Sequence, residues 1–118
     1  MKLKAIICLV AIGILSGCTT VSDAGYYWGN YSNTYYNYTK DPSDKTLAAH
    51  IAELQNIVAK SDEMELKVPP GLYAELGYIS ERQGEPSKSA SYYQKEMELY
   101  PESKTFLERL TSAGKENN

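Results

Sequence analysis

The fold of this chain is decided by residues 70–101, which read PGLYAELGYISERQGEPSKSASYYQKEMELYP. Apolar residues recur at helical spacing up to Gly84, and glycine readily takes the left-handed conformation that ends many helices. Pro86 suits the first turn of a second helix, and Pro101 cannot continue it. The apolar positions are Leu72, Tyr73, Leu76 and Ile79, followed by Ala90, Tyr93, Met97 and Tyr100. The stretch therefore predicts two helices joined by a tight turn.

The spacing of large and small residues in this hairpin resembles a tetratricopeptide repeat. The matching positions are Tyr73, Leu76, Gly77, Gly84, Tyr93 and Pro101. Gly77 would let the second helix approach closely, and Tyr93 would fill the wedge between the two helices. Ser80, Ser89 and Glu96 depart from the pattern, and Glu96 predicts looser packing on one side of the second helix. Because one repeat cannot bury both of its faces, helical neighbours are expected on either side.

Helix signals flank the hairpin. Asp41 is expected to cap a helix whose first residue is Pro42, and residues 62–68 are ambiguous between an extension of that helix and a loop. A short helix is expected over residues 103–112, with Gly114 ending it. The residues expected to face the core are Leu47, Ala48, Ile51, Leu54, Ile57 and Val58 in the earlier helix and Phe106, Leu107 and Leu110 in the last.

Residues 26–38 alternate aromatic side chains with asparagine, serine and threonine. Trp28, Tyr31, Tyr35 and Tyr38 recur at steps of three and four, which favours a helix over a strand. These four residues would either line the core of a first hairpin or form a contact surface. Tyr26, Tyr27 and Tyr36 would then face elsewhere, and they are candidates for an interaction surface.

These elements predict an all-α fold of five helices, with two stacked hairpins like those of tetratricopeptide repeats and a C-terminal capping helix. The predicted domain covers residues 26–114, and residues 115–118 are expected to be a disordered tail.

The N-terminal residues resemble a bacterial lipoprotein signal. Lys2 and Lys4 precede an apolar run, which ends in Leu15-Ser16-Gly17-Cys18, a lipobox sequence. The run is short for a transmembrane helix, which is the competing interpretation. The resemblance implies a signal peptide over residues 1–17, acylation of Cys18 and a lipidated tether over residues 18–25. Acyl chains on Cys18 would hold the protein to a membrane, and Thr19 favours the outer membrane, with the domain facing the periplasm.

The chain as a whole resembles a family of short bacterial lipoproteins catalogued as domain of unknown function 4810. The resemblance is carried by the lipobox, Tyr-Trp-Gly at 27–29, Asp-Pro-Ser-Asp at 41–44 and Val-Pro-Pro-Gly-Leu-Tyr-Ala-Glu-Leu-Gly at 68–77. It implies no activity. It does imply partners in the cell envelope, among them a lipoprotein similar to the curli secretion channel.

Charge and composition make several kinds of ligand and site unexpected in this chain. Removal of residues 1–17 would leave ten basic and fifteen acidic residues, a net charge of −5, so nucleic acid is not an expected partner. Both cysteines would be lost or acylated, and His50 is the only histidine, so no metal site and no cofactor are expected. His50 is expected to be a partly exposed helix residue, and the chain is expected not to be an enzyme.

The sequence thus predicts a protein-interaction domain that acts as a scaffold or assembly factor for an envelope complex. The first helix of the repeat-like hairpin supplies the expected binding residues, Tyr73, Glu75, Tyr78 and Arg82. One alternative is a pilotin-like chaperone that escorts a secretin. Another is a glycan or peptidoglycan binder that uses Tyr26, Tyr27 and Tyr36.

Overall fold

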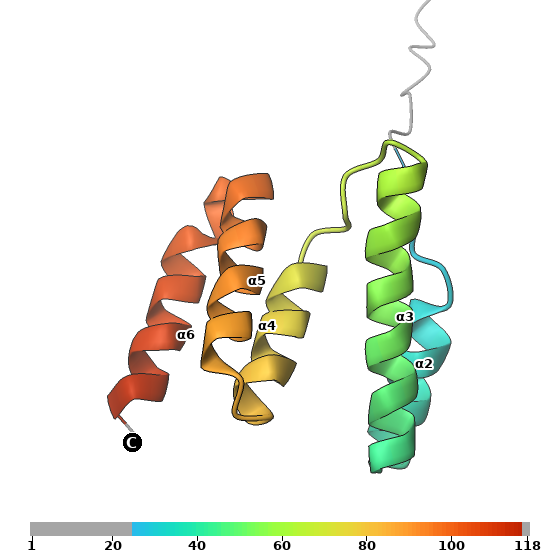
Figure 1. The fold of residues 1–118 in the computed structure, drawn as a ribbon, viewed down its shortest axis with the longest axis horizontal. Coiled ribbons are helices and arrows are strands. Elements are labelled where there is room, and N and C mark those ends of the chain that lie inside the picture. Colours follow the sequence, from blue (N-terminus) through green and yellow to red (C-terminus); the bar gives the residue numbers. More distant parts are fainter. Residues whose placement is uncertain (1–24, 117–118) are drawn as a thin grey trace, which may run out of the picture.

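The computed structural model describes residues 25–116, and the regular secondary structure in that range is entirely helical, with no strand (Figure 1). The elements are α2 (Tyr31–Lys40), α3 (Asp44–Glu63), α4 (Leu72–Arg82), α5 (Pro86–Leu99), a 3₁₀ turn η1 (Pro101–Ser103) and α6 (Lys104–Glu116). The predicted all-α class with five helices is confirmed. The signal peptide, Cys18 and most of the tether lie outside the described residues.

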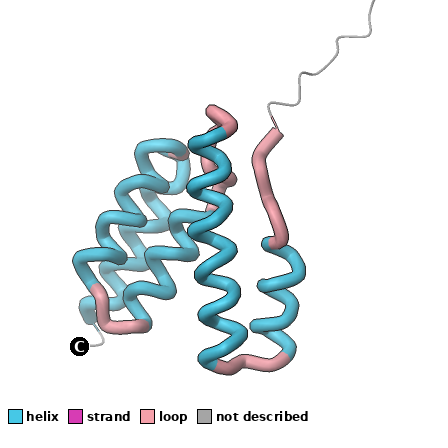
Figure 2. The backbone as a smooth tube through the Cα atoms, turned by 45° about the vertical axis from the view of Figure 1, so that its right-hand side comes forward, coloured by secondary structure: helices cyan, strands magenta, loops and turns pink. Residues whose placement is uncertain are grey.

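The helices form two antiparallel hairpins followed by α6. Helices α2 and α3 pack together, as do α4 and α5, and α6 continues beyond α5 (Figure 2). A connection of eight residues, 64–71, leads from α3 to the start of α4. This arrangement places α2 and α3 on one side of α4, and α5 and α6 on the other (Figure 1).

One apolar core joins the two hairpins. Its fully or largely buried members are Leu54 and Ile57 from α3, Val68 from the connection, and Leu72 and Leu76 from α4. The Tyr100 hydroxyl donates to the backbone carbonyl of Val68 at 2.7 Å, which ties the connection to the end of α5. Burial of aliphatic side chains from both hairpins makes the separation of α3 from α4 costly.

The contact between α4 and α5 has the form that the sequence predicts. Tyr93 is 2 % exposed, and its ring lies where a Cβ atom on Gly77 would be only 2.6 Å from it. Gly84 has φ of +75°, which confirms a left-handed residue in the turn. The expectation for Glu96 is wrong, because this residue is 2 % exposed. Its Oε1 accepts the Gly71 N–H at the start of α4, at 2.7 Å.

The start of α3 differs from the sequence prediction. The helix begins at Asp44, and Ser43 is its N-cap, so Asp41 and Pro42 precede the helix. The Ser43 hydroxyl accepts the Thr46 N–H at 3.2 Å, and the Thr46 hydroxyl accepts the Ser43 N–H at 3.0 Å. Ser43 and Thr46 thus satisfy two backbone donors reciprocally, as in a capping box.

Three further expectations need correction. Helix α2 begins at Tyr31, so Trp28 precedes it. In α6 Leu107 is buried and Leu110 partly so, whereas Phe106 is 65 % exposed instead of facing the core. Helix α6 also continues past Gly114 to Glu116, so residues 115 and 116 of the expected tail are helical.

Candidate functional site

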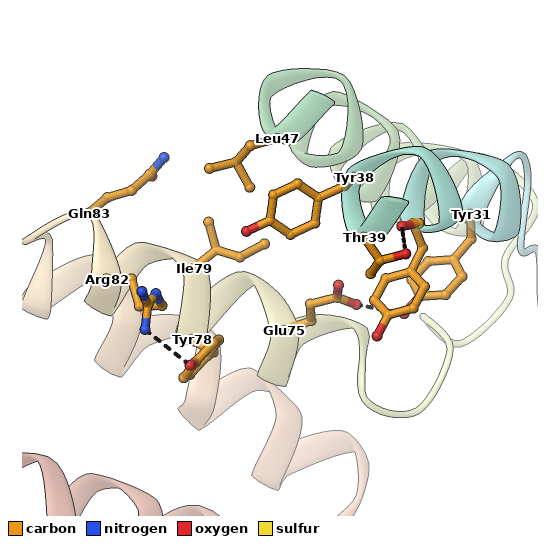
Figure 3. Close-up of a pocket in the computed structure, with 10 residues that line it drawn as sticks. Tyr31, Tyr38, Thr39, Leu47, Glu75, Tyr78, Ile79, Arg82 and Gln83 are labelled. Carbon is orange, nitrogen blue, oxygen red and sulfur yellow. Dashed lines mark hydrogen bonds between the residues drawn. The ribbon is translucent and has the colours of Figure 1, made fainter. Parts of the chain in front are cut away.

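A groove of about 670 Å³ lies between the α2–α3 hairpin and α4 (Figure 3). Its walls come from three helices, because α2 and α3 face α4 across it. The lining residues are Tyr31, Tyr35, Tyr38 and Thr39 of α2, Leu47 of α3, and Glu75, Tyr78, Ile79 and Arg82 of α4 with the adjoining Gln83. The groove is therefore mainly aromatic and aliphatic, with a few polar groups along it.

One end of the groove is closed by hydrogen bonds to Glu75. The Tyr31 hydroxyl donates to Glu75 Oε2 at 2.8 Å, and His50 Nε2 lies 2.7 Å from Glu75 Oε1. Because a carboxylate only accepts, the Nε2 proton of His50 is donated to Glu75. Both carboxylate oxygens therefore have partners, and residues from α2, α3 and α4 meet at this point.

His50 is fully buried, so the expectation that it would be partly exposed is wrong. The rings of Tyr31, Tyr35 and Tyr38 surround it at centroid distances of 5.4, 5.7 and 6.3 Å. On its other side Nδ1 lies 2.8 Å from the Thr34 hydroxyl oxygen. The imidazole thus connects Thr34 of α2 to Glu75 of α4.

The environment of Tyr31 favours its neutral form. Burial is the main cause that raises the pKa of Tyr31 well above the ordinary tyrosine value, and the hydrogen bond to Glu75 adds to it. A neutral hydroxyl is the form that can donate to the carboxylate.

The order Thr34–His50–Glu75 places a hydroxyl, an imidazole and a carboxylate in sequence, as nucleophilic enzymes do. In this structure the same three groups connect α2, α3 and α4. The imidazole is fully buried, and the Thr34 oxygen lies 3.1 Å from the Tyr31 carbonyl and 3.4 Å from the Asn30 carbonyl of its own helix start. The Thr34 hydroxyl has one hydrogen, so it can donate either to His50 Nδ1 or to one of these carbonyls.

The binding residues expected on α4 divide into two groups. Glu75, Tyr78 and Arg82 line the groove together. Tyr73 instead stacks on Tyr92 of α5, with ring centroids 6.0 Å apart, and it lines a separate hollow beside the 64–68 connection.

None of the three N-terminal candidates lines the groove. Tyr36 is 57 % exposed, with the Lys40 ammonium 5.6 Å from its ring centre. Tyr26 is exposed, and Tyr27 is half-buried against the core. The groove is lined instead by Tyr35 and Tyr38, for which the sequence left core and contact surface open, and by Leu47 and Ile79, which were expected in the core.

The four aromatic residues that the sequence places on one stripe over residues 28–38 differ in burial. Tyr31 and Tyr38 are half-buried, but Trp28 and Tyr35 are 42 % and 46 % exposed. The helical spacing identified the face of α2 that meets α3, while the depth of burial along that face depends on how far α3 and α4 extend over it.

Residues 25–116 offer neither a metal-binding cluster nor a membrane-spanning helix. This part of the chain contains no cluster of three histidine, cysteine, aspartate or glutamate residues that could hold a metal ion. It also has no helix with the length and apolar character needed to cross a bilayer.

Comparison with known proteins identifies the family of this chain. No curated protein and no solved structure was found to match the chain. A family model, described as domain of unknown function (DUF4810), matches residues 26–110, which run from the start of the aromatic segment into α6. Because this match spans most of the sequence, the chain belongs to the DUF4810 family.

Proposed function

We propose that this protein is an outer-membrane lipoprotein whose periplasmic helical domain binds another envelope protein and acts as a scaffold or assembly factor. In this proposal α2 to α5 form two repeats similar to tetratricopeptide repeats, and α6 caps the second. The lipobox ending in Cys18 supports the anchor. A lipoprotein similar to the curli secretion channel is the first candidate partner.

The groove is the observation that carries the proposed binding role. Tyr35 and Tyr78 are 46 % and 45 % exposed on its two walls, and Leu47 and Ile79 lie near each other beside Tyr38 (Figure 3). Tyrosine binds partners well because it buries a large area and loses little conformational freedom. A preformed hollow with apolar walls and few polar groups is also the usual form of a binding site.

The anchor can be tested by growing cells with a palmitate analogue that carries a chemical tag. The wild-type protein should become labelled and fractionate with the outer membrane, and Cys18→Ser should do neither. An unlabelled wild-type protein would contradict the anchor.

The binding role can be tested by site-specific photo-crosslinking in living cells. A photoreactive amino acid at position 35 or 78 should give a discrete protein adduct. The same residue at position 106, which is exposed on α6 outside the groove, is the matched control. Absence of protein adducts from both groove positions, or an identical adduct from position 106, would contradict the proposal.

The identity of the adduct separates the alternatives. A curli-channel-like lipoprotein would support the scaffold role, and a secretin would support the pilotin-like role. Binding to purified sacculi that is lost in a Tyr26, Tyr27 and Tyr36 triple variant would support the glycan-binding role.

A further inference from the structure

Arg82 brings a positive charge to the groove, and that charge has no carboxylate partner among residues 25–116. The ion pairs in this part of the chain are His50–Glu75, Lys60–Glu63, Lys88–Glu85 and Lys104–Glu108. The Arg82 guanidinium instead lies 5.8 Å from the centre of the Tyr78 ring, and its Nη1 donates a long hydrogen bond of 3.4 Å to the Tyr78 hydroxyl. The tyrosine holds the guanidinium beside the groove and leaves its charge unneutralised.

The acidic residue in the groove forms no ion pair with Arg82. Glu75 is the one carboxylate that lines the groove, and its two oxygens already accept from Tyr31 and His50. The full chain carries a net charge of −3, so an unpaired arginine beside an apolar hollow is a local exception. An anionic group on a ligand would complement it.

The remaining surface of the groove suits a hydrocarbon side chain. Leu47, Tyr38 and Ile79 lie close to one another between the helices, and Arg82 and Tyr78 are on the same side of α4 (Figure 3). The aliphatic side chains of Leu47 and Ile79 line the same groove as the charged Arg82. A peptide is therefore favoured over a glycan, because it can offer an apolar side chain and a carboxylate close together.

We propose that the groove binds a segment of a partner protein in which an aliphatic or aromatic side chain lies near a carboxylate. The apolar side chain packs among Tyr38, Leu47 and Ile79, and Arg82 binds the carboxylate. This inference rests on the proposed function, since it names the kind of partner segment that the same groove accepts.

The test uses the full lipidated protein in detergent and a phage-displayed library of random peptides. Selected sequences should share an apolar residue close to an aspartate, a glutamate or the free C-terminus. A library without enrichment, or enriched peptides that lack any carboxylate near the apolar residue, would overturn the inference. Synthetic versions with a free or an amidated C-terminus distinguish a side-chain carboxylate from a terminal one.

Fluorescence anisotropy with a selected peptide then tests Arg82 directly. Arg82→Ala should weaken binding about three- to fivefold, as expected for one exposed ion pair. A version of the peptide in which an amide replaces the carboxylate should bind Arg82→Ala and the wild type equally. Arg109→Ala, at the other arginine of the chain, is the matched control and should bind like the wild type.

Reversing the charge at position 82 distinguishes a lost ion pair from a misfolded variant, because a misfolded protein would bind neither peptide. Arg82→Glu should lose the acidic peptide and bind a version in which lysine replaces the acidic residue. Equal binding of the acidic peptide by wild type, Arg82→Ala and Arg82→Glu would overturn the inference. Protein adducts from position 35 in cells would, in that case, still support the proposed function, so the two failures are distinguishable.

Discussion

At the scale of the residue, Gly77 sets how closely α4 and α5 approach. A Cβ atom at this position would lie 2.6 Å from Cδ1 and Cε1 of the buried Tyr93 ring. We expect Gly77→Ala to lower the free energy of unfolding by about 2 kcal/mol, since a methyl group in a packed contact forces the ring to move. Urea denaturation measures this effect.

The same substitution in a Tyr93→Leu background provides the control. Without the ring, the added methyl group has room, so Gly77→Ala should cost clearly less there. An equal loss in both backgrounds would mean that the helix contact does not depend on this pair.

Because Tyr93 is buried, the free energy of unfolding should depend on pH in the alkaline range. Burial is the main cause that raises the pKa of Tyr93 to about 12. The hydrogen bond with Ser89 lowers this pKa, and the negative charge of Glu81 raises it. An unfolded tyrosine ionises near pH 10, so between about pH 10 and 12 the unfolded state binds fewer protons than the folded state. The stabilisation from neutral Tyr93 is complete below pH 10 and is lost as the pH rises through 12.

Denaturation at a series of alkaline pH values should therefore show falling stability. Tyr93→Phe should show a shallower fall, because the phenyl ring does not ionise. Identical slopes for wild type and variant would contradict this account of Tyr93.

At the scale of the element, two helix ends use the same backbone motif with different residues. After α3, Glu65 has φ of +55°, with bonds from Leu66 N to Ser61 O and from Glu65 N to Asp62 O. After α4, Gly84 takes the corresponding position, with bonds from Glu85 N to Ser80 O and from Gly84 N to Glu81 O. Both ends are Schellman motifs, in which glycine is the favoured left-handed residue.

Opposite effects are therefore expected from opposite substitutions. Glu65→Gly should stabilise the protein and Gly84→Ala should destabilise it, each by about 1 kcal/mol, because a side chain is strained in the left-handed region. A Cβ atom on Gly84 would meet no other atom within 4 Å, so packing does not complicate the comparison. Thermal unfolding checks both variants, and shifts in the same direction would contradict the explanation.

At the scale of the whole molecule, Glu75 joins the two hairpins through polar contacts. It accepts hydrogen bonds from His50 of α3 and Tyr31 of α2. A double-mutant cycle of His50→Ala and Glu75→Ala should give a coupling energy of about 1–3 kcal/mol, since these residues form one network. Glu98→Ala is the matched control, because Glu98 is exposed and accepts a bond only from Gln94 of its own helix.

Hydrogen exchange shows where this coupling acts. In Glu75→Ala the amides of α2 and α3 should exchange faster, while those in the α4–α5 contact keep their protection. Uniformly faster exchange across all helices would mean that Glu75 supports the whole core instead of joining the two hairpins.

The sequence by itself determined the elements whose signals are local. Gly84 and Pro86 mark the turn between α4 and α5, and the spacing of Gly77 and Tyr93 gives their contact, because helix periodicity and turn chemistry act over a few residues. The same local information predicted Asp41 as the cap of α3, whereas the cap in the structure is Ser43. It also placed both Phe106 and Leu107 in the core, although only Leu107 is buried, since neighbouring apolar residues fit one helical stripe almost equally well.

Only the tertiary structure decided which surface becomes the groove. The contact of His50 with Glu75 joins residues 25 positions apart, and no local pattern in the sequence encodes that distance. The burial of His50, the occupation of both Glu75 oxygens and the unpaired charge of Arg82 all follow from how the α2–α3 hairpin packs against α4. A helix pattern specifies which side chains share a face, but the identity of the facing residue depends on the packing of the whole chain.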